Sequence, residues 1–194
     1  MFDSLKLLDR ELFLYLNGFH YSITDEFMFY VSQVWVFFPL FIYWLYLVYK
    51  KYDLKKTLIL VGFLAVLIGF TDQSSNRVKH YVKRYRPTHN IEIGEKVHIL
   101  HDYRGGKYGF FSGHSANCFG IAMLLFLVFS NKPLWFRSIF FVWAAITAYS
   151  RIYLGVHYPS DIFIGFLVGL FWGFVVFKLI QFTFKKYFNE PIAV

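Results

Sequence analysis

An uncharged run from residue 27 to residue 49 constrains this chain most strongly. A continuous apolar stretch of about 20 residues is the length that crosses the hydrocarbon core of a bilayer as a helix. Further apolar runs follow at about 57–70, 113–130, 134–149 and 162–184. The sequence therefore predicts an all-α integral membrane bundle with about five transmembrane helices. Pro39 should kink the first of them.

The first 17 residues have a different pattern. Charged residues separate apolar ones that recur at helical spacing, namely Phe2, Leu5, Leu8, Leu12 and Leu16. This pattern predicts an amphipathic helix lying on the membrane surface, although a helix packed on a neighbouring subunit has the same signature. The sequence contains no linker or internal repeat, so we interpret residues 1–194 as a single membrane domain.

The composition narrows the class of partner. Apolar residues make up 57% of the chain, and the net charge is +8. Because no soluble basic domain carries this charge, lipid head groups or a phosphorylated substrate are expected as partners, and nucleic acid is not. The single cysteine, Cys118, excludes an internal disulfide and is interpreted as a packing residue.

A polar stripe follows the second apolar run. Five side chains fall at spacings of four, three, four and three, which puts Asp72, Asn76, Lys79, Lys83 and Arg86 on one face of a continuing helix. Pro87 disfavours helical backbone at the residue before it, so the helix should stop at Arg86. The stripe is either a solvated basic face or a surface that meets an anion inside the bundle.

Two further polar clusters lie between apolar runs. In residues 150–161, Arg151 could clamp an anion, and His157 could attack or transfer a proton. Asp161 is four residues after His157 and shares its face if the segment is helical, so the two could form a hydrogen bond. In the other cluster, Ser112 is a good N-cap for the third apolar helix, and a helix N-terminus is a ready anion site.

Five crossings place the lysine-rich turn at 50–56, the turn at 131–137 and the C-terminus on one side. By the positive-inside rule this side is cytoplasmic and the N-terminus is outside. The outer loop spans residues 88–111 and, together with the helix end before it, is strongly basic from Arg77 to Lys107. These charges conflict with the rule unless several of them bind anions. The three polar clusters then share the outer face.

These clusters resemble the three signatures of the type 2 phosphatidic acid phosphatase (PAP2) superfamily. The first corresponds to Lys79 and Arg86-Pro87 (79–87), the second to Ser112-Gly113-His114 (112–114), and the third to Ser150-Arg151 with His157 and Asp161 (150–161). One departure is Phe111, where the family usually has proline. Proline contributes no functional group, so the change affects how the loop enters the helix rather than the chemistry. The resemblance covers roughly residues 57–175.

The resemblance implies a membrane lipid phosphatase that forms a phosphohistidine intermediate. His157 would be the nucleophile, and Asp161 would orient it. His114 would protonate the leaving oxygen and later activate water. The phosphoryl oxygens would be held by Lys79, Arg86, Ser112, Gly113 and Arg151.

No carboxylate cluster suits Mg²⁺ or Ca²⁺, and the histidines lack the spacing of a zinc helix, so we expect a metal-independent enzyme without a cofactor. Four histidines match no signature and are interpreted as loop residues: His80, His89, His98 and His101. The candidate substrates are polyprenyl diphosphate, lipid A phosphate, phosphatidylglycerophosphate and phosphatidic acid. In a bacterium, the site would face outward from the inner membrane. A lipid phosphotransferase and a non-catalytic anionic-lipid binder or transporter are the alternatives.

A glycine strip marks the last apolar helix. Gly165, Gly169 and Gly173 recur every four residues, which gives a smooth surface that another helix can approach closely. Packing within the chain is the default interpretation, and a homodimer formed through this strip is the alternative.

Overall fold

The apolar and amphipathic segments form seven α-helices in the computed structural model, which describes residues 2–192. The helices are α1 Phe2–Asn17, α2 Ser22–Val31, α3 Phe38–Lys51, α4 Leu54–Val82, α5 Gly113–Val128, α6 Leu134–Tyr153 and α7 Pro159–Phe188. Short 3-10 turns lie at η1 Val34–Phe37, η2 Pro87–His89 and η3 Gly94–Lys96. The expected all-α class is confirmed, since the described residues contain no strand beyond an isolated bridge between Tyr85 and Tyr108.

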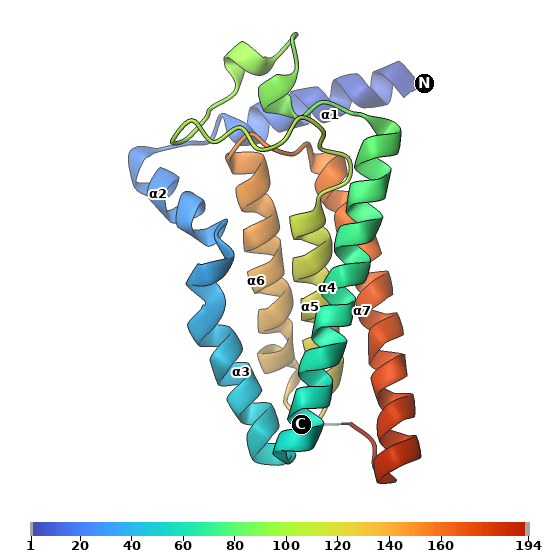
Figure 1. The fold of residues 1–194 in the computed structure, drawn as a ribbon. Helices are drawn as coiled ribbons and strands as arrows, with labels where there is room; N and C mark the ends of the chain where they lie inside the picture. The colour runs from blue at the N-terminus through green and yellow to red at the C-terminus, as the bar shows by residue number, and fades with distance from the viewer. Residues whose placement is uncertain (1, 193–194) are drawn as a thin grey trace.

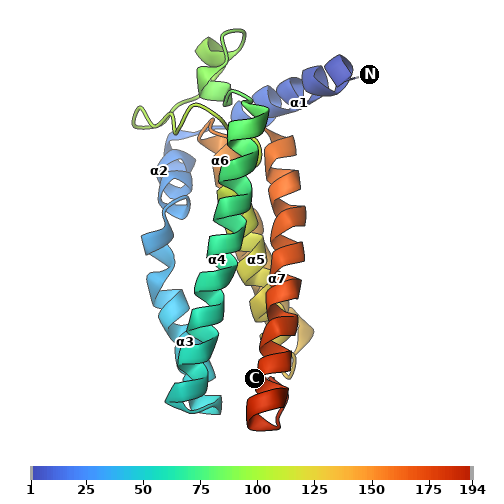
Figure 2. The same cartoon turned by 45° about the vertical axis from the view of Figure 1, so that its right-hand side comes forward.

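Helices α3 to α7 run side by side along the bundle, and the two termini lie at its opposite ends (Figures 1 and 2). Three segments are long and apolar enough to cross a membrane: Val34–Lys51, Leu54–Val82 and Pro159–Phe188. The shorter apolar α5 and the neighbouring α6 run between the same two ends. With the three segments above, α5 and α6 make five that run along the bundle, in line with the expected membrane bundle of about five helices.

Helix α1 lies across one end of the bundle, beside the loop that joins α4 to α5 (Figure 1). Leu5, Leu8 and Leu12 are exposed by 57%, 60% and 48%, whereas Phe13 is fully buried. Exposed leucines on a helix that lies across the end of the bundle match the surface helix that was predicted. Met1, the first residue of that predicted helix, lies outside the described residues.

The first crossing is broken rather than kinked. Helix α2 ends at Val31, and α3 begins only after a 3-10 turn. Pro39 lies in the first turn of α3, where its missing N–H costs no helical hydrogen bond. The prediction of one helix kinked at Pro39 was therefore wrong, because the proline starts a new helix instead of bending an existing one.

Helix α4 ends at Val82, four residues before the predicted end. Lys83 takes a left-handed conformation with φ 50°, and its N–H donates to the Lys79 carbonyl at 3.0 Å. The chain then pairs in an antiparallel manner with the end of the 88–111 loop, through Arg86 N–H to Lys107 O at 3.2 Å. Lys83 therefore leaves the polar stripe and is exposed, and Arg86 reaches the site from a loop, not from the helix as predicted.

Helix α5 is the centre of the bundle, and its most extensive contact is with α7. A Cβ atom added at Gly165 would lie 2.6 Å from Ser112 O, and one at Gly169 would lie 2.5 Å from Ala116 O. Gly173 would likewise meet Gly120 O at 2.6 Å. The strip thus packs against α5 within the chain, as the default interpretation held. A second copy could use it only by displacing α5.

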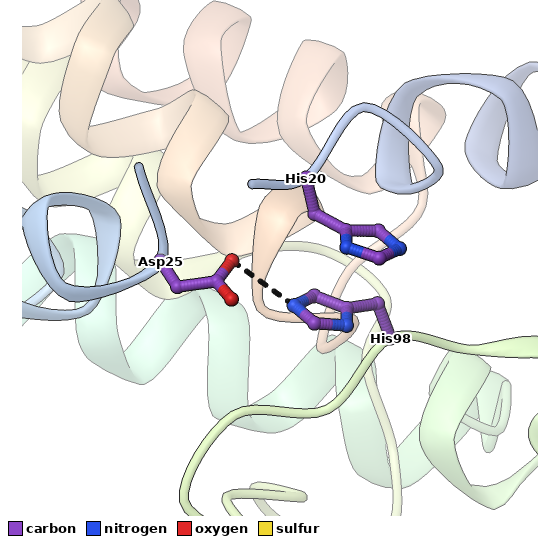
Figure 3. Close-up of side chains that lie close together, drawn as sticks. All are labelled: His20, Asp25 and His98. Carbon is purple, nitrogen blue, oxygen red and sulfur yellow. Dashed lines mark hydrogen bonds and ion pairs between the residues drawn. The ribbon is translucent and has the colours of Figure 1, made fainter. Parts of the chain in front are cut away.

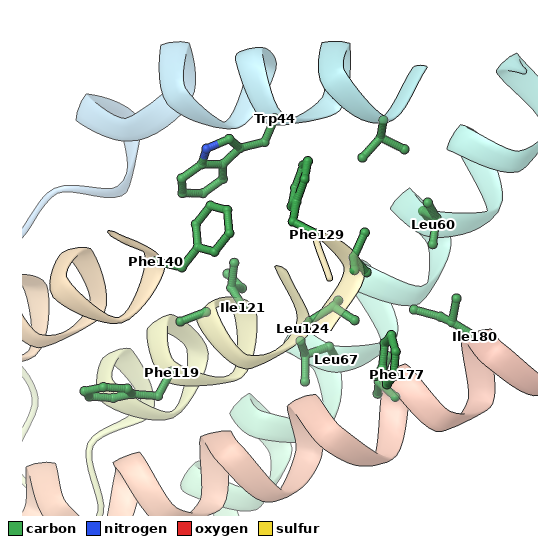
Figure 4. Packing of buried hydrophobic residues seen from close by; sticks show 14 of the residues in the cluster. Trp44, Leu60, Leu67, Phe119, Ile121, Leu124, Phe129, Phe140, Phe177 and Ile180 are labelled. Atoms are coloured by element: carbon green, nitrogen blue, oxygen red, sulfur yellow. The ribbon is translucent and has the colours of Figure 1, made fainter. Parts of the chain in front are cut away.

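Below the polar end, aromatic rings fill the space between α3, α5 and α6 (Figure 4). Trp44 meets Phe140 edge to face with ring centroids 4.9 Å apart, and Phe129 packs against the same Phe140 ring at 5.7 Å. An edge-to-face pair such as Trp44–Phe140 adds about 0.5–1.5 kcal/mol beyond the burial of its area. The Trp44–Phe140 pair holds α3 to α6 at the end away from the polar clusters, and the Phe129–Phe140 pair joins the end of α5 to α6.

The glycine strip gives the first prediction. Gly169→Ala should lower the free energy of unfolding by about 1–3 kcal/mol, because the added methyl group overlaps a backbone oxygen of α5. Gly62→Ala is the matched control, since nothing lies within 4 Å of its Cβ position and alanine favours helix over glycine. Thermal unfolding in detergent would measure both. Equal stability of the two variants would contradict the packing of the strip on α5.

Candidate active site

The segment between α6 and α7 forms the base of the site. Helix α6 continues to Tyr153, so Arg151 is on its last turn. The chain then reverses at Gly155, whose φ of +71° a side chain would oppose. The Arg151 carbonyl accepts the N–H groups of Val156 and His157 at 3.1 and 3.2 Å. This turn places His157 just before α7.

The structure brings His157 and Asp161 together. His157 Nδ1 lies 3.3 Å from Asp161 Oδ2, and the two side chains are about 2% and 0% exposed. The same Oδ2 accepts the Tyr158 N–H at 3.1 Å, at a helix N-terminus that favours negative charge. The pair forms although His157 is not helical, so the predicted contact is present but the predicted shared helical face is not. Because Nδ1 faces Asp161, Nε2 is the ring nitrogen left for chemistry.

Arg86 lies against that second nitrogen. Its Nη1 is 3.3 Å from His157 Nε2 and also donates to Val156 O at 3.2 Å, while Nε donates to Tyr108 O at 3.2 Å. Burial, together with the positive charges of Arg86 and Arg151, lowers the pKa of His157 well below its ordinary range. A neutral imidazole keeps the lone pair that a nucleophile needs.

Arg151 presents a buried donor without an acceptor. The residue is 2% exposed, and its Nη2 donates to the Tyr103 hydroxyl of the 88–111 loop at 2.8 Å. Its Nε has no hydrogen-bond partner among the described residues. Leaving a buried N–H unpaired is costly, and an anion bound beside it would supply the acceptor.

The N-terminus of α5 forms another wall of the site. Ser112 is the predicted N-cap: its Oγ accepts the Ser115 N–H at 3.3 Å. Its own N–H donates to Asp161 O at 3.0 Å, which joins the second polar cluster to the third. His114 follows on the first turn and faces the same cavity as Lys79.

That cavity has a volume of about 850 Å³ and two chemically different ends. Its polar end includes Asp72, Lys79, Arg86, Gly113 and His114. Its apolar end lies between the first crossing and α4 and is lined by Phe37, Phe38, Phe41, Ile42, Leu45, Leu64 and Ile68. The first two predicted clusters therefore line one cavity that continues into an apolar space. The third cluster joins them through the contacts of Arg86 with His157 and of Ser112 with Asp161, so all three converge.

Arg84 is a site residue that the sequence reasoning missed. Its Nη1 donates to Asp161 Oδ1 at 2.9 Å, so the carboxylate that contacts His157 also forms an ion pair on its other oxygen. The guanidinium stacks on the Tyr158 ring with its central carbon 3.9 Å from the centroid. A buried carboxylate without such a cation would carry a large desolvation cost.

Asp9 connects α1 to the same group. Its Oδ2 accepts from Arg84 Nη2 at 2.5 Å, and its Oδ1 accepts the Ser160 N–H at 2.9 Å. The surface helix is thus joined through Arg84 to Asp161 and from there to His157. No local pattern signals these contacts, because the partners are 75 or more residues apart in the chain. The only hint was the position of Arg84, two residues before Arg86.

Comparison with known proteins now identifies the family. The model of the PAP2 superfamily matches residues 56–185, which include all three clusters. The chain belongs to the PAP2 superfamily. It is 36% identical over 178 residues to the lipid A 4'-phosphatase of Porphyromonas gingivalis, covering 89% of this chain and 72% of that protein.

Two further relatives agree. The lipid A 4'-phosphatase of Bacteroides thetaiotaomicron is 35% identical over 181 residues, covering 91% of this chain and 79% of that protein. The crystal structure of Aquifex aeolicus LpxE matches with a TM-score of 0.67 and 27% identity, over 88% of this chain and 95% of that one. The predicted class, an integral membrane lipid phosphatase, is confirmed.

The Arg84 contact leads to a second prediction. Arg84→Gln should lower kcat about 100-fold, because Asp161 loses its ion pair and no longer fixes the orientation of the His157 ring. The KM should change little, since Lys79, Arg86 and Arg151 remain. Lys83→Gln removes the same charge from an exposed neighbour and should retain wild-type activity. Phosphate-release kinetics would measure both, and a wild-type kcat for Arg84→Gln would exclude the positioning role.

Proposed function

We propose that this chain removes a phosphate group from a lipid A-type glycolipid at the outer face of the membrane. The proposal rests on one observation: cationic side chains and an apolar space lie in the same cavity. A lipid phosphate needs both parts, because its head group is anionic and its tails remain in hydrocarbon. The names of the two lipid A 4'-phosphatases favour this substrate over the other candidates.

In the first step, His157 Nε2 attacks phosphorus, and the bond from phosphorus to the lipid oxygen breaks. Asp161 accepts the Nδ1–H of the ring and stabilises the positive charge that develops on it. His114, which lines the cavity, gives its proton to the leaving oxygen. The products of this step are the dephosphorylated lipid and a phosphohistidine.

In the second step, His114 takes a proton from water, and the water oxygen attacks phosphorus as the bond to Nε2 breaks. Inorganic phosphate leaves, and His157 is neutral again. In both steps Lys79, Arg86 and Arg151 neutralise the phosphoryl oxygens. The N-terminus of α5, with Ser112 and Gly113, adds backbone N–H groups and the positive end of a helix dipole.

The reaction is proposed to need no metal ion. Cationic side chains already supply the charge that a metal would contribute. The carboxylates nearest the phosphate position are engaged elsewhere: Asp161 pairs with Arg84 and His157, and Asp72 accepts from Asn117 at 2.9 Å.

The main prediction concerns His157. His157→Ala should abolish phosphate release in detergent, whereas His80→Ala, which changes an exposed histidine, should retain it. The assay uses a panel of lipid A, polyprenyl diphosphate, phosphatidylglycerophosphate and phosphatidic acid. We expect the highest kcat/KM for lipid A, with activity unchanged by EDTA.

Each outcome of that assay tests a separate element of the proposal. Turnover by His157→Ala would exclude the phosphohistidine mechanism. Loss of wild-type activity in EDTA would exclude metal independence. A higher kcat/KM for one of the other three lipids would overturn the substrate assignment but not the mechanism.

The proposed orientation puts the site outside the cytoplasm, in the inner membrane of a bacterium. Lysines gather at the opposite end of the bundle, in the turn between α3 and α4 and at the end of α7. The positive-inside rule favours that end as cytoplasmic. We predict that a reporter enzyme active only outside the cytoplasm is inactive when fused after residue 194. An active fusion at that position would reverse the orientation.

A further inference from the structure

Two histidines and an aspartate lie close together (Figure 3), and none of them lines the cavity described above. His20 comes from the turn between α1 and α2, Asp25 from the first turn of α2, and His98 from the 88–111 loop. Each residue offers one possible metal-ligand atom, and these three atoms lie within 4.8 Å of one another. None of the three belongs to a PAP2 signature, and the mechanism above does not use them.

We propose that His20, Asp25 and His98 bind a divalent transition-metal ion of the Zn²⁺ class, which clamps the 88–111 loop to the start of α2. Imidazole nitrogen combined with a carboxylate oxygen suits Zn²⁺, whereas Mg²⁺ and Ca²⁺ prefer oxygen ligands alone. Three protein ligands leave the fourth tetrahedral position for water. His20 is exposed, so an ion can enter from solvent.

Two of the ligands already have suitable spacing. His98 Nε2 lies 3.1 Å from Asp25 Oδ1. Two ligand atoms bound at about 2.0–2.1 Å in a tetrahedron are about 3.3–3.4 Å apart, so an ion can replace the present hydrogen bond with little movement.

Neighbouring groups hold these two ligands in place. The Tyr153 hydroxyl donates to Asp25 Oδ1 at 2.6 Å, in the manner of an outer-shell partner that orients a ligating carboxylate. The buried Asn17 side chain fixes the His98 backbone, because its Oδ1 accepts the His98 N–H at 2.8 Å and its Nδ2 donates to the His98 carbonyl at 3.4 Å. Hydrogen bonds from Tyr153 and Asn17 therefore hold two of the three proposed ligands in position.

The third ligand has to rotate. The His20 and His98 rings are stacked with centroids 3.7 Å apart and planes inclined by 2°. An ion between parallel rings would lie outside both ring planes, whereas the nitrogen lone pair lies in the plane of its ring. Each ring has one nitrogen on the side of Asp25 (Figure 3), so turning the exposed His20 ring out of the stack aims its nitrogen at the ion.

The clamp would stabilise the loop that covers the phosphate site without entering the chemistry. The same loop supplies Tyr103, whose hydroxyl accepts from Arg151. A second contact between α2 and this loop, His101 Nε2 to Glu26 Oε1 at 3.0 Å, has a single histidine and serves as an internal comparison.

The test measures metal binding, not catalysis. The untagged protein is stripped with EDTA and titrated with Zn²⁺ by calorimetry, and its thermal unfolding is followed with and without the ion. We expect one ion per chain and a higher Tm with Zn²⁺, because a ligand that binds only the folded state stabilises it. His98→Gln and Asp25→Asn should each lose the Tm shift and at least about tenfold in affinity, whereas His101→Gln should match the wild type.

Asp25→Asn keeps an acceptor for Tyr153 and therefore provides a second variant if His98→Gln does not fold. The proposal is overturned if the wild type binds no stoichiometric Zn²⁺, if both ligand variants bind it normally, or if His101→Gln loses binding equally. None of these outcomes depends on phosphatase activity.

Discussion

The close contact between α5 and α7 determines where the chemistry can occur. Glycines let the two backbones meet, since a Cβ at Gly165 would lie 2.6 Å from Ser112 O. At the top of this contact the Ser112 N–H donates to Asp161 O, so the first turns of the two helices are joined. Both helices begin at the same end of the bundle (Figures 1 and 2). Their N-termini therefore direct two positive dipole ends towards the proposed phosphate site.

Because Asp161 lies in the first turn of α7 at this contact, its negative charge is buried and is balanced by Arg84. The carboxylate is fully buried, and Arg84 takes one oxygen while His157 and the Tyr158 N–H share the other. A buried carboxylate with both oxygens engaged cannot turn, so it holds the histidine ring in one orientation. In the described part of the chain, no carboxylate forms an ion pair with Lys79, Arg86 or Arg151, which leaves these charges for a phosphate group.

The sequence predicted the helical class from the lengths of the apolar runs and the family from local motifs. It predicted that the three clusters converge because the number of membrane crossings between them places all three at the same face. It did not predict where α4 ends. Lys83 adopts a left-handed conformation that lysine does not favour, and pairing of the next residues with 107–109 stabilises it. The break before Pro39 was missed for a related reason, since the same proline can bend one helix or begin another.

The sequence also did not predict the contacts between segments that are distant in the chain. Asp9, Arg84 and Asp161 form one ion-pair network, and His20, Asp25 and His98 form one cluster, but neither set has a spacing that marks it. In the sequence, Asp9 is only one of the charges between the apolar residues of the amphipathic helix. The fold adds a contact between Asp9 and α7, because α1 crosses the end of the bundle where α7 begins and the Ser160 N–H donates to Asp9.

The two ends of the cavity contribute differently to recognition. Phe37, Phe41 and Leu64 offer an apolar wall, and burial against such a wall is non-directional, so it distinguishes tails mainly by volume. One methylene group changes binding by only about 1–3 kcal/mol in a site of this kind. At the polar end, hydrogen bonds fix the direction of the cationic groups: Arg86 contacts His157, and Arg151 nearby donates to the loop residue Tyr103. For the proposed reaction, discrimination between lipid phosphates would then come from the head-group side, where the 88–111 loop contacts Arg86 and Arg151.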